Sequence, residues 1–500
     1  MTNQKPSQTQ LFVVGIGASA GGLRALEEFL ENMPVDSGAA FVVIQHLSPD
    51  FKSLMKELLE RRTRMAIYRV TEGMMLEANS IYLIPPGKNL VVENNQLHLL
   101  EQEDRNRHGL NFPIDIFFES LARNCAEHAV GIILSGTGSD GSNGLRAINE
   151  AGGFAMAQDP ATAEFDGMPR TAIATGVVDQ VLSAPALAAF VYQLIRSFVE
   201  IPVSSRSQLQ PFESHKLQLV ANILAKYEQT DFSHYKTSTL TRRIHRRCLI
   251  SGCNNLEEYI SLLELSSEER SILRHDLLIS VTQFFRDPEA WKYLETSVIP
   301  QLIELAKPGE EIRFWVTACA TGEEAYSLAI LLEEAMERMD KQVRVKIFAT
   351  DIDKEALEKA TNGVYPETIA NDVTSERLQR YFIRREQSYQ VIRKLRERVL
   401  FAPHDITKDA GFTRMNMITC RNVLIYMQSE LQQQVLRNLH FSLLSQGVLF
   451  LGEAETLGNI EEEFKPLSKK SKIYQKRREV RLPIPTRGVE KISRSNFLPQ

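Results

Sequence analysis

The sequence predicts two α/β units joined by a small all-helical block. Short apolar runs alternate with amphipathic helix patterns from Leu11 to about Phe198, and a second alternation begins near residue 312. Such alternation is typical of helices packed around a mainly parallel sheet. Between the two alternations, residues 215–278 show helix periodicity with little strand signal.

The length also requires several domains, because 500 residues exceed one ordinary domain. The linker, IPVSSRSQLQPFES, is polar and contains two prolines. From Lys465 onward the sequence has eleven Lys or Arg residues and only two Glu residues. That end reads as a final strand, KIYQKR, and a loose basic tail. The predicted divisions are a first α/β domain at 11–198, a linker at 199–214, a helical domain at 215–278, a second α/β domain at 279–478 and a tail at 479–500.

Composition excludes several classes of protein. A hydrophobic fraction of 43% and a charged fraction of 24% are ordinary for a globular chain, and a net charge of −5 gives no general attraction to nucleic acid. The polar N-terminus has no apolar signal core, and no apolar stretch is long enough to cross a membrane. We therefore expect a cytoplasmic protein. Five scattered cysteines without a C-x-x-C pair predict neither a disulfide framework nor a metal site.

The stretch LFVVGIGASAGGLRALEEFL combines a strand, a glycine-rich turn and a helix pattern, and it has two interpretations. Gly15, Gly17 and Gly21 form a loose dinucleotide fingerprint, whereas the same turn reads as G-x-S-x-G, a nucleophile elbow that presents Ser19. A dinucleotide site needs an acid at the end of the second strand. The second strand, FVVIQHL, ends instead in Gln45-His46. A histidine at that place favours the elbow, since a serine nucleophile needs a base.

Asp140 supplies the third member of a catalytic triad. It follows the apolar run GIILSG and a turn with three glycines, and Ser19 and His46 also stand at or just past strand ends. Carboxyl ends of parallel strands meet at one edge of a sheet, where active sites form. Each residue alone has a plainer explanation: Ser19 as a simple turn, His46 as a polar residue ending a strand, and Asp140 as a cap of the helix that follows it. The order Ser–His–Asp also differs from that of α/β-hydrolases.

These segments carry a family resemblance. GIGASAGG, VVIQHLSPDF, LSGTGSDGSNGL and AQDPATAEFDGMPRTAI, spread over residues 11–195, resemble the catalytic domain of CheB-type chemotaxis methylesterases. The resemblance implies that Ser19 is the nucleophile, His46 the general base and Asp140 its orienting carboxylate. It also implies a glutamate γ-methyl ester on a receptor helix as substrate, with deamidation of receptor glutamines as a second activity. Backbone N–H groups at the helix start after Ser19 would hold the oxyanion.

The sequence departs from this family at two positions and in its domain content. Ala20 stands where the family often has a hydroxyl residue, and Thr137 where Met is common. Stand-alone members carry a receiver domain ahead of the catalytic domain. Because only ten residues precede Leu11, phosphorylation in cis is not expected.

The second α/β unit has the acid that the first lacks. FWVTACATGEEAYSLAILLEE is a strand, a loop with one glycine, Gly322, and a helix, and the next strand ends at Asp351. An acid there grips ribose hydroxyls, whereas Glu323 and Glu324 at the helix start would repel a pyrophosphate. S-adenosylmethionine, which has ribose and a cationic sulfonium but no phosphate, fits better than NAD. Taken alone, Asp351 could equally cap the helix pattern EALEKA.

This half resembles CheR-type protein-glutamate O-methyltransferases. The motifs are VTQFFRDP, TACATGEEAYS, ATDID, FAPHDIT and CRNVLIYM, and the match runs over residues 212–478. By this resemblance, the domain has a Rossmann-like fold, and Arg286 and Tyr426 stand beside the methyl acceptor. Ser280 replaces an Asn of some members. The residues implied to line the S-adenosylmethionine site are Ser280, Thr282, Arg286, Ala318, Glu324, Asp351, Asp405, Ile406, Asn422 and Val423.

The methyl transfer asks for positioning rather than proton transfer. A glutamate side chain, with a pKa of ~4.3, is already ionised at neutral pH, so no general base is needed. The site has only to desolvate the carboxylate and align it with the S–methyl bond. The fork of Arg286 suits that task.

Two further segments have open interpretations. In TRRIHRRC, Arg242 and Arg246, and Arg243 and Arg247, repeat at i, i+4 and predict one basic helix face. This face is either solvated or, as in the family, a docking surface for an acidic receptor helix. YFIRREQSYQVIRKLRERVLF predicts a short antiparallel β insert between Gly363 and Leu400. Some family members dock a receptor tail peptide on this insert.

Taken together, the sequence predicts a fused methylesterase and methyltransferase that modifies a methyl-accepting chemotaxis-type receptor on its cytoplasmic helices. The alternative is a sensory scaffold in which one or both domains bind without turnover. Family members often continue into sensor and kinase domains, so sensor or kinase partners are expected and this chain is either shortened or part of a longer protein. Nucleic acid and membrane insertion are not expected.

Overall fold

The computed structural model describes residues 11–45, 55–102, 111–199, 212–253, 255–278, 282–307, 309–385, 388–480 and 482. His46 and Ser280 lie outside these residues. The chain divides into two compact units. One comprises residues up to Ser233 together with Thr237–Val281 and Val364–Gln390, and the other comprises His234–Lys236, Thr282–Gly363 and the residues from Val391 onward.

The first unit is built on a seven-stranded, wholly parallel sheet with the order β10-β9-β8-β1-β2-β5-β3. The central strand β1 is buried along its whole length, and β8 and β2 flank it. The strands are β1 (Phe12–Ala18), β2 (Ala39–Gln45), β3 (Ala66–Arg69), β5 (Ser80–Leu83), β8 (Ala129–Ile133), β9 (Phe154–Gln158) and β10 (Gln180–Leu182). The expected parallel-sheet α/β fold is therefore confirmed.

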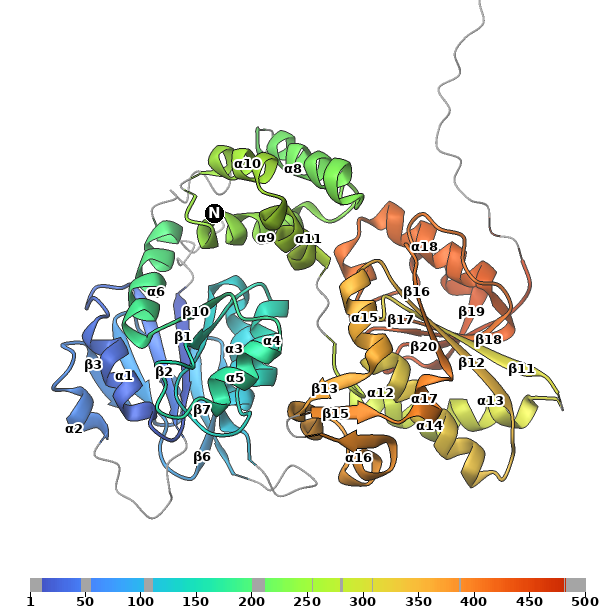
Figure 1. Ribbon diagram of the computed structural model, residues 1–500, viewed down its shortest axis with the longest axis horizontal. Coiled ribbons are helices and arrows are strands. Elements are labelled where there is room, and N and C mark those ends of the chain that lie inside the picture. The colour runs from blue at the N-terminus through green and yellow to red at the C-terminus, as the bar shows by residue number, and fades with distance from the viewer. Residues whose placement is uncertain are drawn as a thin grey trace, which may run out of the picture. The chain divides into compact units, whose positions relative to one another are not determined.

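Helices cover both faces of this sheet (Figure 1). One face packs against α1 (Gly22–Glu31), α2 (Met55–Leu59) and α6 (Ala184–Val199), and the other against α3 (Pro113–Cys125), α4 (Ser142–Glu150) and α5 (Gly167–Ala174). A short 3-10 helix, Ala126–His128, follows α3. The helix α3 lies very close to β1, since a Cβ atom at Gly15 would come within 2.8 Å of Phe118 and one at Gly17 within 2.6 Å of Ile114. These two glycines therefore serve packing.

Two apolar runs of the first unit form strands that do not join the main sheet. NLVVE and QLHLL form β6 (Lys88–Glu93) and β7 (Gln96–Glu101), an antiparallel pair that makes a separate three-stranded sheet with β4 (Met74–Met75). The turn between them holds Asn94 and Asn95 at φ 49° and 65°. Two consecutive left-handed residues define a type I′ turn, which favours a tight hairpin over a crossover.

The predicted helical block is present as four helices: α8 (Phe212–Glu228), α9 (Thr237–Ile250), α10 (Leu256–Leu265) and α11 (Ser267–Leu278). Asn255 caps α10, because its side chain accepts a hydrogen bond of 2.9 Å from the N–H of Glu258. The block has no strand among its described residues other than an isolated bridge at Tyr235.

The second unit contains a seven-stranded sheet with the order β16-β12-β11-β17-β18-β20-β19. The first five strands are parallel and the last two are antiparallel. They are β11 (Glu311–Thr317), β12 (Arg344–Asp351), β16 (Val399–Pro403), β17 (Met415–Cys420), β18 (Leu443–Leu451), β19 (Phe464–Ser468) and β20 (Ile473–Lys476). The expected Rossmann-like fold is confirmed.

Helices connect these strands. They are α12 (Pro288–Tyr293), a π-helical turn (Leu294–Val298), α13 (Ile299–Leu305), α14 (Glu323–Arg338), α15 (Lys354–Asn362), α17 (Arg393–Arg396), α18 (Ser429–Ser442) and 3-10 turns at Leu424–Tyr426 and Gly458–Glu463. The expected β insert is also present. It consists of β13 (Val364–Pro366), β14 (Phe382–Arg384) and β15 (Ser388–Val391) in the order β13-β15-β14, with a 3-10 turn (Glu367–Asn371) and α16 (Ser375–Tyr381).

Within the described residues, no helix is long and apolar enough to span a bilayer. The five cysteines are free thiols, and no cluster of acidic, histidine or cysteine side chains among the described residues has the arrangement of a metal site.

Candidate active sites

Ser19 stands at the apex of a tight strand-to-helix turn. The strand β1 ends at Ala18 and α1 begins at Gly22. The N–H of Ser19 donates to the carbonyl of Ser135 at 3.0 Å, and the N–H of Gly22 donates to the carbonyl of Ser19 at 3.0 Å. Gly21 has φ 67°, and a Cβ atom there would lie 2.8 Å from the Oγ of Ser135. This turn therefore depends on glycine at position 21, as a nucleophile elbow does.

The segments that carry the other predicted triad residues follow the two strands beside β1. The last residue of β2, Gln45, pairs with Ala18, and the strand β8 leads into the turn that contains Asp140. His46 comes directly after Gln45 in the sequence and lies outside the described residues. Adjacent parallel strands end at one edge of the sheet, so Ser19 and Asp140 belong to neighbouring loops on that edge.

Asp140 is buried and caps a helix other than its own. Its Oδ2 accepts a hydrogen bond of 3.0 Å from the N–H of Ile114, and its Oδ1 accepts one of 2.9 Å from the N–H of Asp115. Both donors belong to the first turn of α3. The helix that follows Asp140 has Gly141 as its N-cap residue and no side-chain cap. The simpler sequence interpretation, a cap of the following helix, is therefore wrong, because the carboxylate is fixed by a helix from another part of the chain.

Ser135 organises this edge and was not singled out by the sequence. Its buried Oγ donates to the carbonyl of Ala20 at 2.9 Å and accepts from the N–H of Phe165 at 2.9 Å, while its N–H donates to Oε1 of Gln158 at 2.9 Å. It thus ties the Ser19 turn to two other loops. In the sequence LSGTGSD, a serine among glycines looks like any turn residue, so no local signal marks it.

In the second unit, Asp351 is the last residue of β12. Its Oδ2 accepts from the N–H of Ala320 at 2.8 Å and its Oδ1 from the N–H of Asp353 at 2.9 Å. Burial raises the pKa of Asp351, and these backbone N–H groups act in the opposite direction. The helix α15 is capped by Asp353, whose side chain accepts from the N–H groups of Glu355 and Ala356. The alternative that Asp351 is the helix cap is therefore wrong.

The loop between β11 and α14 has strained backbone at the same edge. Ala318 and Ala320 have φ values of 48° and 46°, and Gly322 has φ 93°. A left-handed conformation costs a non-glycine residue roughly 1–2 kcal/mol, and such residues concentrate at ligand sites. A Cβ atom at Gly322 would lie 2.8 Å from that of Ala360, so the loop closes against α15.

A buried arginine, Arg421, links the segment before α12 to the start of α14. Its Nη1 donates to Oε2 of Glu324 at 2.9 Å, and its Nη2 donates to Oδ2 of Asp287 at 2.6 Å and to the carbonyl of Arg286 at 3.0 Å. The second oxygen of Glu324 accepts from the Oγ1 of Thr419 at 2.5 Å. Arg421 therefore fixes Glu324 and the backbone of Arg286 together. Its position inside the motif CRNVLIYM gives no local sign of this role, because Glu324 and Asp287 lie 97 and 134 positions away.

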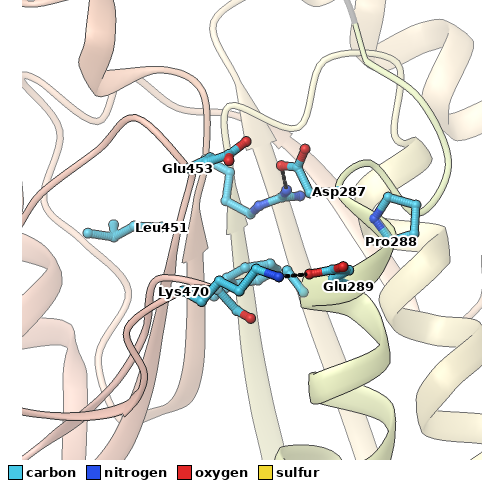
Figure 2. A pocket seen from close by; sticks show the side chains of 10 residues that line it. Asp287, Pro288, Glu289, Leu451, Glu453 and Lys470 are labelled. Carbon is cyan, nitrogen blue, oxygen red and sulfur yellow. Dashed lines mark hydrogen bonds and ion pairs between the residues drawn. The ribbon is translucent and has the colours of Figure 1, made fainter.

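Arg421 also lines a pocket of about 200 Å³, which Figure 2 shows. Asp287, Pro288, Glu289, Leu451, Glu453 and Lys470 line this pocket, and Lys470 forms an ion pair with Glu289 across it. The guanidinium of Arg421 lies 4.4 Å from the ring centre of Phe450, which also lines the pocket. The pocket adjoins the turn that contains Arg286, where Phe285 and Asp287 have φ values of 51° and 63°.

The remaining predicted cofactor residues follow β16 and β17. Asp405 and the buried Ile406 come after β16, and Oδ1 of Asp405 accepts from the N–H and the hydroxyl of Thr407 at 2.9 and 2.6 Å. Asn422, at φ 58°, and Val423 follow β17. Strands β16, β12, β11 and β17 are neighbours, so Asp405, Asp351, Ala318 and Asn422 follow the carboxyl ends of four adjacent strands. Thr282 and Arg286 precede α12, and Tyr426 ends the 3-10 turn after Asn422.

Glu455 holds the turn after β17 in place. Its Oε1 accepts from the N–H groups of Val423 and Leu424 at 2.9 and 2.8 Å, and its Oε2 accepts from the N–H of Gly452 at 2.7 Å. The sequence gives no local sign of this role, because Val423 and Leu424 lie 32 and 31 positions away in the chain.

Tyr235 also belongs to the second unit, although it lies between two helices of the helical block. The N–H of Lys236 donates to the carbonyl of Tyr426 at 2.8 Å and the N–H of Gln428 to the carbonyl of His234 at 3.0 Å, so that Tyr235 pairs with Met427. Burial raises the pKa of Tyr235, and the charges of Asp405 and Asp351 act in the same direction. Tyr235 therefore lies near both acids of the predicted cofactor site.

The side chains at this edge of the sheet fit S-adenosylmethionine. Asp351, at the end of the second strand, presents a carboxylate suited to ribose hydroxyls, and Glu324 places negative charge at the start of α14, where a phosphate would be repelled. The geometry is thus typical of two classes of domain: a parallel α/β domain with an elbow serine at the carboxyl edge of its sheet, and a Rossmann-like domain with an acid at the end of its second strand.

Comparison with known proteins gives the family of each part. Residues 14–191 match the family model of the CheB methylesterase, residues 215–278 that of the all-alpha domain of the CheR methyltransferase, and residues 280–473 that of its S-adenosylmethionine-binding domain. The chain belongs to the CheB methylesterase and CheR methyltransferase families, which it combines in one polypeptide. S-adenosylmethionine is the cofactor of the second family.

Three relatives are similar to different parts of the chain. The chain is 38% identical over 455 residues to an uncharacterized 104.1 kDa protein of Rhodobacter capsulatus, a match that covers 87% of this chain and 47% of the relative. It therefore spans about half the length of that protein. It is 30% identical over 246 residues to chemotaxis protein methyltransferase 2 of Vibrio cholerae, covering 48% of this chain and 85% of the relative. It is 35% identical over 192 residues to a protein-glutamate methylesterase/protein-glutamine glutaminase of Geobacillus kaustophilus, a match that covers 38% of this chain and 55% of the relative.

The basic face predicted on α9 is not an exposed surface. Arg243 is 1% exposed, Arg246 2% and Arg247 9%. Arg243 donates from Nη2 to the carbonyl of Asn149 at 2.9 Å, and Arg246 forms an ion pair with Asp179. Both partners belong to the methylesterase part of the first unit, whereas Arg247 makes a bidentate pair with Glu269 of α11 at 3.0 and 2.7 Å. Arg242 packs over Gly152, where a Cβ atom would lie 2.4 Å from Nε.

The expectation of a solvated or receptor-docking surface was therefore wrong for these three arginines. Their i, i+4 spacing correctly predicted a shared helix side, but their acidic partners lie 67 and 22 residues away in the chain. These three arginines therefore belong to an internal packing surface, where each buried guanidinium has a hydrogen-bond or ion-pair partner.

The pairing of Arg246 predicts a large loss of stability on truncation. Arg246→Ala leaves the buried carboxylate of Asp179 without its cation, which typically costs about 3–5 kcal/mol. We expect a clear fall in the urea midpoint of the first unfolding transition of the full chain. The control is Arg24→Ala, which removes the exposed partner of Glu28 and should leave that midpoint almost unchanged. A wild-type midpoint for Arg246→Ala would contradict the internal packing role.

Asp351 predicts a binding defect. Asp351→Ala removes the ribose acceptor and should weaken S-adenosylmethionine binding by about 1–3 kcal/mol, the range for hydrogen bonds that involve a charged group. Titration calorimetry measures this directly. Asp340→Asn, an exposed change at the far end of α14, serves as the control. Unchanged affinity in Asp351→Ala, or tight binding of NAD by the wild type, would exclude the assignment.

Proposed function

We propose that this chain removes methyl groups from the glutamates of a chemotaxis-type receptor with its first domain and adds them with its second. The observation that carries the proposal is the pair of strand-end sites: an elbow serine beside a fixed aspartate in one sheet, and a ribose-binding acid beside an anchored arginine segment in the other. Membership of both families supports the same conclusion.

In the first domain, the Oγ of Ser19 attacks the carbonyl carbon of a glutamate γ-methyl ester while His46 accepts its proton. Asp140 orients the imidazole and stabilises its charged form. The N–H groups of Ala20 and Gly21, beside Ser19 at the start of α1, are the proposed donors to the oxyanion. The proton passes from His46 to the departing methanol, and water then hydrolyses the acyl-enzyme by the same steps. Glutamine deamidation would follow this course with ammonia as leaving group.

The two departures from the family pattern fall beside this chemistry. Ala20 is half-buried in the turn that holds Ser19, so it offers only its backbone groups to a bound ester. Thr137 is exposed in the loop that leads to Asp140. Neither residue replaces a member of the triad, and we expect both to affect substrate fit rather than the reaction itself.

In the second domain, S-adenosylmethionine supplies an activated methyl group on a cationic sulfonium. The residues proposed to hold it are Thr282, Arg286, Ala318, Glu324, Asp351, Asp405, Ile406, Asn422 and Val423, with Ser280 outside the described part of the chain. Arg286 and Tyr426 would hold the acceptor glutamate, whose carboxylate oxygen is already a nucleophile. Arg421 fixes the carbonyl of Arg286, so the acceptor side of the site is pre-organised.

A scaffold without turnover is the competing proposal. It predicts binding to receptor helices with no methanol release and no methyl transfer. The elbow at Ser19, with the buried Asp140 fixed at the same sheet edge, favours catalysis, because buried carboxylates in fixed positions concentrate at active sites.

The first test concerns Ser19. Ser19→Ala should lower ester hydrolysis by ~10⁴-fold or more, since the triad works as a unit, and leave methyl transfer unaffected. Methanol release from receptor methylated in vitro is the measurement. Ser37→Ala is the control, because it removes a hydroxyl from the same domain at a residue that precedes β2, at the opposite edge of the sheet. A wild-type rate of methanol release in Ser19→Ala would rule out the triad.

The second test concerns Arg286. Arg286→Ala should lower the rate of methyl transfer at saturating receptor and at every salt concentration, because a contact inside the site is poorly screened. Initial rates with labelled S-adenosylmethionine over a salt series measure this. Arg338→Ala is the control, because Arg338 is in the last turn of α14, whereas the predicted site lies at the start of that helix. A defect that disappears at high receptor concentration would show that Arg286 contributes only to docking.

A further inference from the structure

Asp115 follows Ile114, whose N–H donates to Asp140. It is a buried carboxylic acid that the proposed mechanism does not use. It occupies the first turn of α3 and is 6% exposed. Its Oδ1 accepts a hydrogen bond of 2.7 Å from the N–H of Gly144, in the first turn of α4. Its own N–H donates to Asp140 at 2.9 Å.

The two aspartates therefore cap each other's helices. The first N–H groups of any α-helix lack partners within the helix, and both α3 and α4 begin without a side-chain cap from their N-cap residues. Asp140, which precedes α4, accepts from two N–H groups of α3, and Asp115 of α3 accepts from one N–H group of α4. Three hydrogen bonds thus join the two helix starts in both directions.

The packing of the helices makes this exchange possible. A Cβ atom at Gly144 would lie 2.3 Å from that of Phe118, so α3 and α4 approach too closely for any larger residue there. A Cβ atom at Gly141 would lie 2.7 Å from Ile114. Because Gly141 and Gly144 both belong to the start of α4, the side chains of Ile114 and Phe118 on α3 pack directly against the backbone there.

The surrounding charges give the two carboxyls different roles. Burial, and then the negative charge of Asp140, raise the pKa of Asp115 well above its usual range. Glu119 on α3 acts in the same direction, while the N–H of Gly144 and the cation of Arg146 on α4 oppose it. The neutral form of Asp115 is thereby favoured, and it still offers Oδ1 as an acceptor.

We propose that Asp115 is a positioning residue of the methylesterase triad, which holds the carboxylate of Asp140 in its catalytic orientation by locking the start of α4 to the start of α3. The proposal rests on the proposed hydrolysis by Ser19, His46 and Asp140. If Asp115 loses its acceptor, the start of α4 is released, and Asp140, which directly precedes that helix, can rotate relative to its two donors. A misplaced orienting carboxylate lowers the rate of the chemical step without changing how the receptor binds.

The experiment compares three variants of the full chain. Asp115→Ala removes the acceptor and should lower kcat for ester hydrolysis by roughly 10- to 100-fold with an unchanged KM for methylated receptor. Asp115→Asn keeps a neutral side chain with an acceptor oxygen and should recover most of the rate. Glu119→Gln, an exposed carboxyl one helical turn further along α3, is the matched control and should hydrolyse the ester at the wild-type rate. Methyl transfer by the second domain, measured in the same samples, normalises the amount of intact protein.

Each outcome decides the matter. A wild-type kcat in folded Asp115→Ala, or a loss in kcat that follows only the fraction of unfolded protein seen by thermal melting, would overturn the proposal. If Asp115→Ala does not fold, Asp115→Asn is the decisive variant. A folded Asp115→Asn that loses the rate as fully as Ser19→Ala would overturn the proposal, because its side-chain oxygen still accepts a hydrogen bond. Ser19→Ala separates this from a failure of the proposed function. Normal hydrolysis in Ser19→Ala refutes the triad, whereas inactive Ser19→Ala with normal Asp115→Ala refutes only the role of Asp115.

Discussion

The unsatisfied N–H groups at helix starts are the constraint on which both sites depend. A helix that begins at the carboxyl edge of a parallel sheet leaves backbone donors that must find acceptors, and burial makes an unmet donor expensive. In this protein carboxylates meet that need: Asp140 at α3, Asp115 at α4 and Asp353 at α15. Glu455 does the same for the turn after β17. The acids are therefore held by the backbone before any substrate arrives.

The two domains put this arrangement to different chemical uses. In the methylesterase domain a capping carboxylate is itself a member of the proposed triad, so folding and catalysis depend on the same hydrogen bonds. In the methyltransferase domain the helix cap and the proposed ribose acceptor are separate residues, Asp353 and Asp351, two positions apart. Asp351 is hydrogen-bonded to the loop after β11 through Ala320, so the proposed role of Asp351 would couple cofactor binding to the conformation of that loop.

The sequence predicted the features that are local and missed those that join distant segments. The strand ends at Ser19, Asp140 and Asp351 followed from apolar runs that stop at polar residues, and the helical block followed from its periodicity. The hairpin of β6 and β7 could have been anticipated from Asn94 and Asn95, a local turn signal that was passed over. By contrast, Ser135, Arg421 and Tyr235 contact partners far away in the chain. Arg243 and Arg246 of α9 likewise contact residues of the methylesterase part, 94 and 67 positions away. Spacing shows which residues share a helix side but not what that side meets.

The two glycines inside β1 place a limit on how this hydrolase can vary. Gly15 and Gly17 allow α3 to lie directly on the strand that ends at Ser19, and the first turn of α3 holds Asp140. A methyl group at either glycine would lift the helix and move the carboxylate, although neither position touches a receptor. In a library of random variants selected for lost hydrolysis, substitutions at the middle of a buried strand would therefore be recovered beside those in the triad, and an inspection of substrate contacts alone would classify them as neutral.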